Sequence, residues 1–175
     1  MKNIIKLFLI LFVAFGVFGC SSGTYYNTNS PKIDANKDLK RVYIHSVSAP
    51  NIEQTYINHK GEKINLDQRI DAAFFRFLKQ ELRKRGMVLV SSQDSPYTWR
   101  ADFKFTKFSV SHKNTIFDGK MSGKLALKNI NYSKNFTINS QLTQESVNKS
   151  EVSNKIDLLA QALASRAADH INQLK

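Results

Sequence analysis

The sequence predicts an α+β fold, a two-layer sandwich with two helices packed on one face of a mostly antiparallel sheet of about five strands. Two stretches, 65–86 and 152–174, carry apolar residues at helical spacing. Between them, three stretches alternate apolar and polar residues, which is typical of strands buried on one face. Helices packed on one side of the sheet would cover all of these apolar faces.

The first helix is predicted to run from Asn65 to Gly86. Asn65 can accept a hydrogen bond from the first helical turn, and Gln68 stands three residues later, the spacing of a capping box. Asp67 and Asp71 favour the positive end of the helix dipole, and Gly86 is a natural left-handed stop. The apolar face of this helix comprises Leu66, Ile70, Phe74, Phe77, Leu78 and Leu82.

Two short strands are predicted on either side of this helix. Residues 41–47 are rich in strand-forming residues and end at the turn Ala49-Pro50-Asn51. Residues 87–90 follow the helix as a short apolar strand. Residues 51–63, which include His59-Lys60-Gly61, are predicted to form a loop.

The three alternating stretches predict an antiparallel meander, with turns at 114–119 and 129–134. In the first stretch the alternation changes phase, because Phe108 and Val110 continue the apolar face at even positions. A bulge is therefore predicted near Thr106-Lys107. The apolar face of the meander comprises Trp99, Ala101, Phe103, Phe105, Met121, Gly123, Leu125, Leu127, Phe136, Ile138 and Leu142.

The chain ends in a long amphipathic helix whose apolar stripe needs a surface to cover. His170 lies on this stripe and is predicted to be a partly buried packing residue. The stripe itself comprises Val152, Ile156, Leu159, Leu163, Ala167, Ile171 and Leu174.

The sheet face away from the helices is predicted to be open to water and basic. It is a candidate anion-binding face, and its cations stand among Thr, Ser and Asn side chains. The alternative is that these cations only keep an open sheet soluble and block its aggregation. The cationic residues are Arg100, Lys104, Lys120, Lys124 and Lys128.

The chain begins with a segment that is typical of a signal peptide. Lys2 and Lys6 precede the apolar run 7–18, which is shorter than the roughly 20 residues that a helix needs to cross a bilayer. The run leads into Val17-Phe18-Gly19-Cys20, which resembles the lipobox of bacterial lipoproteins. The resemblance implies that the peptide before Cys20 is removed and that Cys20, the only cysteine, carries acyl chains. An ordinary cleaved signal with an unrelated cysteine and an uncleaved anchor are the alternatives.

The predicted organisation is a cleaved signal peptide (1–19), a lipidated flexible tether (20–38) and a single α+β domain (39–175). The tether is rich in Ser, Thr, Asn and Lys and shows no periodicity. Ser21 follows Cys20, and resemblance to lipoprotein sorting in Gram-negative bacteria implies the outer membrane. The domain is expected on the periplasmic side.

The mature chain is strongly basic. Removing residues 1–19 takes away Lys2 and Lys6, so the net charge of +12 falls by two, to +10. Such a balance bears on partners and solubility rather than on fold. In the envelope the abundant polyanions are lipopolysaccharide phosphates, anionic lipid headgroups and peptidoglycan carboxylates, and export argues against nucleic acid.

The order of elements resembles that of small Gram-negative outer-membrane lipoproteins, the YajG-type family in particular. More distant similarities are to the lipoprotein that plugs the lipopolysaccharide-assembly barrel and to conjugal surface-exclusion lipoproteins. The resemblance implies no functional residue beyond the lipobox. The residues behind it are 77–82, Arg85-Gly86-Met87-Val88, Lys134-Asn135-Phe136 and the helix after Lys155.

Candidate catalytic and metal-binding residues are scattered, so no enzyme activity, metal or cofactor is predicted. A zinc site usually needs three or four clustered ligands, and no two histidines are closely spaced in the sequence. Asp67 and Asp71 fit helix-start electrostatics better than a catalytic pair. The histidines are His45, His59, His112 and His170.

Two functions remain open. The first is a non-catalytic interaction or assembly module of the envelope, which docks onto a protein partner through sheet edges or loops. The second is direct binding of lipopolysaccharide or peptidoglycan by the basic sheet face.

Overall fold

The computed structural model describes residues 39–145 and 149–174. The predicted signal peptide and tether, with Cys20, lie outside the described residues, so their cleavage and lipidation stay predictions. The elements are β1 (Arg41–Ser48), β2 (Thr55–Ile57), β3 (Lys63–Asn65), α2 (Ile70–Lys84), β4 (Val88–Leu89), β5 (Trp99–Lys113), β6 (Ile116–Lys128), β7 (Ser133–Glu145) and α3 (Lys149–Asn172).

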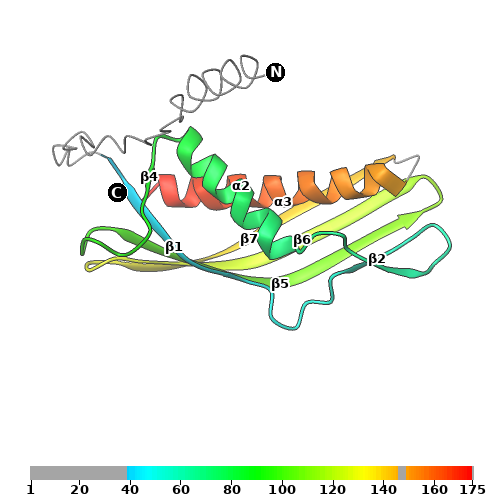
Figure 1. Ribbon diagram of the computed structural model, residues 1–175, viewed down its shortest axis with the longest axis horizontal. Helices are drawn as coiled ribbons and strands as arrows, with labels where there is room; N and C mark the ends of the chain where they lie inside the picture. Colours follow the sequence, from blue (N-terminus) through cyan, green and yellow to red (C-terminus); the bar gives the residue numbers. More distant parts are fainter. Residues whose placement is uncertain (1–38, 146–148, 175) are drawn as a thin grey trace, which may run out of the picture. The chain divides into compact units, whose positions relative to one another are not determined.

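The predicted α+β architecture is confirmed. Helices α2 and α3 lie side by side on one face of the sheet and leave the other face uncovered (Figure 1). Helix α2 packs against β1 and β4, and α3 packs against β6 and β7. The amphipathic stripes that the sequence shows in both helices are therefore buried against the sheet.

The sheet has seven strands and is mixed, which corrects the expected count of about five. Strand β5 pairs with β6 along one edge and with β1 and β2 along the other. The antiparallel order of β5, β6 and β7 is as predicted, but the first turn is shorter than the predicted 114–119, because β6 begins at Ile116. Strand β1 runs parallel to both β4 and β5. The count was too low because β2 and β3 are only three residues long, too short to show a period of two.

The predicted bulge in β5 is confirmed. The pairing of β5 with β6 shifts between Phe105 and Lys107. Beyond the shift Lys107 stands opposite Ser122, which puts Lys107 on the uncovered face. The bulge thus keeps one apolar face along the whole strand although the sequence changes phase.

The predicted start of the first helix is wrong. Helix α2 begins at Ile70, and Asn65 belongs to β3, where it pairs with Thr55. The backbone N–H of Ile70 donates instead to the side-chain oxygen of Gln54, at 3.0 Å, so a residue distant in sequence satisfies the helix start. The predicted end is confirmed, because Gly86 has a left-handed φ of 73°.

The prediction of a loop at 51–63 is wrong for most of this segment, because Thr55 to Asn65 form a β-hairpin that pairs β2 with β3. Asn58 organises its turn, because its side-chain oxygen accepts from the N–H groups of Lys60 and Glu62, each at 2.9 Å. Gly61 has a φ of 82°, which a glycine adopts without strain. This hairpin extends the sheet beside the second half of β5.

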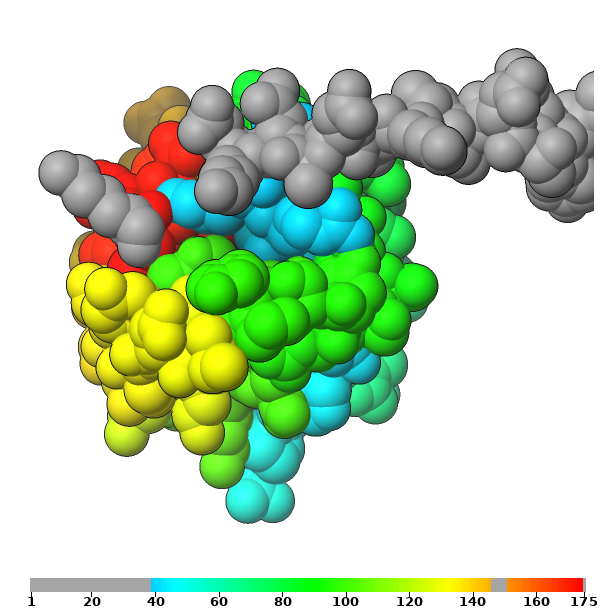
Figure 2. Space-filling model, turned by 90° about the vertical axis from the view of Figure 1, so that its left-hand side faces the viewer, coloured from blue at the N-terminus to red at the C-terminus, as the bar shows by residue number. Residues whose placement is uncertain are grey.

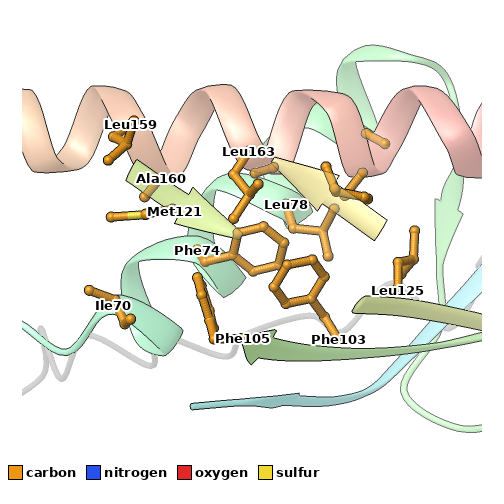
Figure 3. Close-up of a cluster of buried hydrophobic side chains, with 14 of the residues drawn as sticks. Ile70, Phe74, Leu78, Phe103, Phe105, Met121, Leu125, Leu159, Ala160 and Leu163 are labelled. Carbon is orange, nitrogen blue, oxygen red and sulfur yellow. The ribbon is translucent and has the colours of Figure 1, made fainter. Parts of the chain in front are cut away.

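The centre of the core is an aromatic cluster between α2 and β5 (Figure 3). The ring of Phe74 stacks on Phe103 with centroids 4.1 Å apart and meets Phe105 edge-on at 5.4 Å. Gly123 on β6 makes room for this arrangement, because a Cβ there would lie 2.2 Å from Cζ of Phe103. The apolar face that the sequence predicts for the sheet is therefore filled by the aromatic rings of the cluster, and Gly123 leaves the space that Phe103 occupies.

Arg85 ties the two helices together just after α2. Its guanidinium donates to Glu81 Oε2 at 2.6 Å, to Asp169 Oδ1 at 2.8 Å and to the hydroxyl of Ser165 at 2.9 Å. The Glu81 side chain is only 9% exposed, so this carboxylate depends on its cationic partners. The ammonium of Lys84 is the second cationic partner of Glu81, at 2.7 Å from Oε1.

Lys40 binds the carboxyl end of α3. Its ammonium donates to the carbonyl oxygens of Ile171 (3.0 Å), Asn172 (2.6 Å) and Leu174, where a positive charge suits the helix dipole. Burial lowers the pKa of Lys40. The start of β1, the end of α3 and the turn between β6 and β7 thus gather at one end of the domain (Figure 2).

Candidate functional site

The uncovered face of the sheet gathers the predicted cationic residues. Strand register places Lys104 directly opposite Lys124 and Arg100 directly opposite Lys128. Lys120 stands opposite Ser109 on the same face. The four lysines are exposed and Arg100 is half-buried. We call this surface, with Lys107 added by the bulge, the cationic face.

The spacing of the cationic face is regular. Lys120, Lys124 and Lys128 recur every fourth residue of β6, which separates them by about 13 Å along the strand. Side chains directly opposite each other on neighbouring strands have Cβ atoms about 5 Å apart. Two unit charges at about that distance repel by about 1 kcal/mol in water. The opposed cations therefore cost stability unless an anion lies between them.

Arg100 differs from the lysines because it has an acidic neighbour. Its Nε donates to Asp102 Oδ2 at 2.8 Å, and Asp102 Oδ1 also accepts from the hydroxyl of Ser46 at 2.6 Å and contacts His45 Nδ1 at 2.7 Å. Partial burial opposes ionisation of Asp102, but the hydrogen bonds from Arg100, Ser46 and His45 outweigh it and lower the pKa of Asp102. The charge of Arg100 is thus partly compensated.

The lysines of the cationic face have no such compensation. In the part of the chain that the structure describes, none of them lies within 4.0 Å of a carboxylate. Sequence reasoning missed Lys107, because its side of the sheet depends on where the bulge falls. The lysines are Lys104, Lys107, Lys120, Lys124 and Lys128.

Two clusters of polar side chains lie on and near this face. Ser46 donates to Asp102 Oδ1 and His45 contacts the same oxygen, so both residues share one carboxylate and are not bonded to each other among the hydrogen bonds of the described residues. The ring of His59 lies 6.1 Å from that of His112, which sequence spacing did not predict. Within 39–145 and 149–174, no three His, Cys, Asp or Glu side chains group closely enough to hold a metal ion.

A groove of about 300 Å³ lies between the outer edge of β7 and α3. On its α3 side, Arg166 Nη1 donates to the backbone oxygen of Asn139. His170 stacks on Phe136 with centroids 4.4 Å apart and is half-buried, which confirms its predicted packing role. The groove is lined by Thr137, Ile138, Asn139, Arg166, Asp169, His170 and Gln173.

Neither helix of the described part combines the length and the apolar character needed to cross a membrane.

Comparison with known proteins identifies the relatives of this chain. The model of the family "Outer membrane lipoprotein MapA" matches residues 16–174. Two proteins named outer membrane lipoprotein MapA, from Campylobacter jejuni serotypes O:6 and O:2, are each 32% identical over 149 residues, which is 83% of this chain and 70% of the relative. The YajG-type and barrel-plug likenesses are not shown by these matches and stay predictions.

Two solved structures share the fold. A crystal structure described as an uncharacterized protein has a TM-score of 0.58 at 15% identity, covering 78% of this chain and 92% of its own. A protein from Xanthomonas campestris has a TM-score of 0.55 at 10% identity, covering 74% and 81%. At such identities these structures show the fold alone. The family match and the two relatives show that this chain belongs to the MapA family of outer membrane lipoproteins.

Proposed function

We propose that this lipoprotein is a non-catalytic interaction or assembly module of the cell envelope, held in the outer membrane by acyl chains on Cys20 and facing the periplasm. Its family membership supports the outer membrane, and the lipobox supports Cys20 as the anchor. Each buried methylene contributes about 0.8 kcal/mol, so two or three acyl chains hold a protein stably where one is marginal.

Replacing Cys20 with alanine is expected to release the protein from the membrane fraction. The reason is that no acyl chain can then be attached at position 20. Fractionation of cells measures the release from the membrane. Mass spectrometry of the mature amino terminus shows whether position 20 carries acyl chains. Ser21→Ala is the matched control and should stay in the membrane fraction. An intact leader or an unmodified thiol at Cys20 in the parent chain would contradict the proposal.

The cationic face favours an anionic polymer, lipopolysaccharide or peptidoglycan, as the ligand of this module. The observation that carries this choice is that Lys104 faces Lys124 with no carboxylate within ion-pairing distance among the described residues. Asp102 and Asp118 also lie on this face, but Asp102 is bound by Arg100 and Asp118 by Thr143. Neither carboxylate lies within 4.0 Å of the ammonium of Lys104 or Lys124 among the described residues. A polymer with repeated phosphates or carboxylates would relieve the repulsion between the lysines at several points along β6. A protein partner is the second candidate for the ligand.

Reversing the charges of Lys124 and Lys128 to glutamate changes the charge of the face by four units. At about 1 kcal/mol for each unit of charge near an anionic surface, this is expected to weaken binding to purified lipopolysaccharide or peptidoglycan by roughly 1,000-fold. The same variant should gain about 1 kcal/mol of folding stability, because Lys104 and Arg100 then face opposite charges. Binding is measured by sedimentation or calorimetry, and stability by urea unfolding. A variant that is more stable and yet binds less cannot owe its loss to misfolding.

The matched control reverses Lys79 and Arg83 on α2, on the opposite side of the sheet, and so changes the net charge equally. It should keep most of the binding. Equal losses in the two variants would show unspecific attraction to a basic protein. Absence of binding in the parent chain would exclude the polymer and leave the protein partner, which crosslinking in cells would identify.

A further inference from the structure

Strand β7 forms an edge of the sheet over its full length, Ser133–Glu145. It pairs with β6 on one side and, among the described residues, with no strand on the other. Edges of this kind are usually protected by charged residues, proline or a bulge. The side chains that β7 presents on the uncovered face are exposed and uncharged through its middle: Asn135, Thr137, Asn139, Gln141 and Thr143.

The backbone of β7 has hydrogen-bonding groups available on the outer side. Alternate residues of an edge strand turn their N–H and C=O groups away from the neighbouring strand. The carbonyl oxygen of Asn139 is one of these outer groups, because it accepts from Arg166 on α3. Thr137 and Gln141 lie two residues on either side and share this orientation. Among the hydrogen bonds of the described residues, the bond from Arg166 is the one side-chain contact to an outer backbone group at the centre of the edge.

The sequence of β7 is complementary to itself about Asn139, the midpoint of Ser133–Glu145. In a two-fold antiparallel pairing centred there, Phe136 of one copy lies opposite Leu142 of the other, twice. Both side chains are half-buried at the margin of the core, so the pairing would cover their remaining surface. Thr137 would face Gln141, and no two like charges would stand opposite each other along the strand.

We propose that two copies of this chain pair through β7, antiparallel and centred on Asn139, to form a dimer with one continuous sheet. A two-fold axis makes the same patch serve both partners, as the complementarity about Asn139 requires. In this pairing the carbonyl oxygen of Asn139 accepts from a main-chain N–H of the second copy in place of Arg166, and the groove beside it receives side chains of the second copy.

The helix layer accommodates this pairing. Helix α3 lies over β6 and β7, and strands are spaced by about 4.8 Å. The two α3 helices of the dimer would therefore lie about 10 Å apart, within the usual packing distance of neighbouring helices. Neither layer has to open for the second copy to bind.

Crosslinking in the outer membrane tests the register directly. Two full-length chains with different tags are co-expressed, one with Thr137→Cys and the other with Gln141→Cys. In the proposed register these positions are opposite, with Cα atoms about 5.5 Å apart, which suits a disulfide. Mild oxidation should therefore give a mixed dimer. Thr137→Cys in both chains should give at least fivefold less, because those positions are offset by four residues, about 13 Å.

Two controls and a disrupting variant complete the test. The unsubstituted chain shows any crosslinking through Cys20. Lys124→Cys lies on β6, away from the proposed interface, and shows how much crosslinking arises from random collision. Asn139→Lys is added to both chains of the Thr137→Cys and Gln141→Cys pair, which places like charges opposite each other on the two-fold axis. It should reduce the mixed dimer at least fivefold, whereas Asn139→Gln in both chains should not. No mixed dimer, equal crosslinking from the same-site pair, indifference to Asn139→Lys, or capture of a different protein would each overturn the proposal. Polymer binding is read separately, so either proposal can fail alone.

Discussion

Phe74→Ala is expected to lower the free energy of unfolding by about 4 kcal/mol, a large part of the stability of a domain of this size. Phe74 is fully buried on α2, stacks on Phe103 at 4.1 Å and meets Phe105 at 5.4 Å. Alanine leaves a cavity at the centre of this cluster, and the two remaining rings are fixed on β5 and cannot close it. Urea unfolding followed by circular dichroism measures the loss.

Phe75→Ala is the matched control, because it makes the same chemical change at the next position of α2. Phe75 is 39% exposed, and its ring contacts the ammonium of Lys79 at 5.1 Å. Its loss should cost about 1 kcal/mol or less. Similar losses for the two variants would mean that the aromatic cluster is not the centre of the core.

Arg85→Ala is expected to lower the free energy of unfolding by about 3 kcal/mol, because it leaves the buried carboxylate of Glu81 with one cation instead of two. It also removes the bonds to Asp169 and Ser165 that join α2 to α3. Arg76→Ala is the matched control, since Arg76 also bridges the two helices, to Asp157 at 3.5 Å, but both side chains are well exposed. Its effect should stay below about 1 kcal/mol.

The Arg85→Ala effect should depend on pH. Hydrogen bonds from Lys84 and then Arg85 lower the pKa of Glu81 below its ordinary value of 4.5. A lowered pKa in the folded state stabilises the fold above pH 4.5, and this stabilisation is lost as the pH falls through the folded-state pKa. The difference in stability between the parent chain and Arg85→Ala should therefore shrink below pH 4.5. An unchanged difference in strong acid would show that the Glu81 contact does not carry the effect.

The long elements could be predicted because their apolar residues repeat over many positions. The meander, the bulge near Lys107 and the end of α2 at Gly86 all follow from local patterns. The start of α2 could not be predicted, because the group that receives the N–H of Ile70 belongs to Gln54, far from the helix in sequence. The β2–β3 hairpin was missed because three-residue strands carry no recognisable period.

The candidate site was predictable as a face but not as a set of pairs. Alternation alone places Lys104 and Lys124 on the side away from the helices. Their direct opposition depends on strand register, and so does the contact of Asp102 on β5 with His45 on β1. The free edge of β7 was equally hidden, because a sequence does not tell which strand of a sheet is last.

The attachment of β1 has a mechanical consequence. Leu39 and Lys40 are the first described residues on the side of Cys20, and β1 follows them with a parallel neighbour on each edge. A pull from an anchored amino terminus along β1 would load the bonds of both edges together, in shear, and would reach the last turn of α3 through Lys40. We therefore expect the domain to resist unfolding under tension better than it would if its tether led into a terminal hairpin that could be peeled open bond by bond.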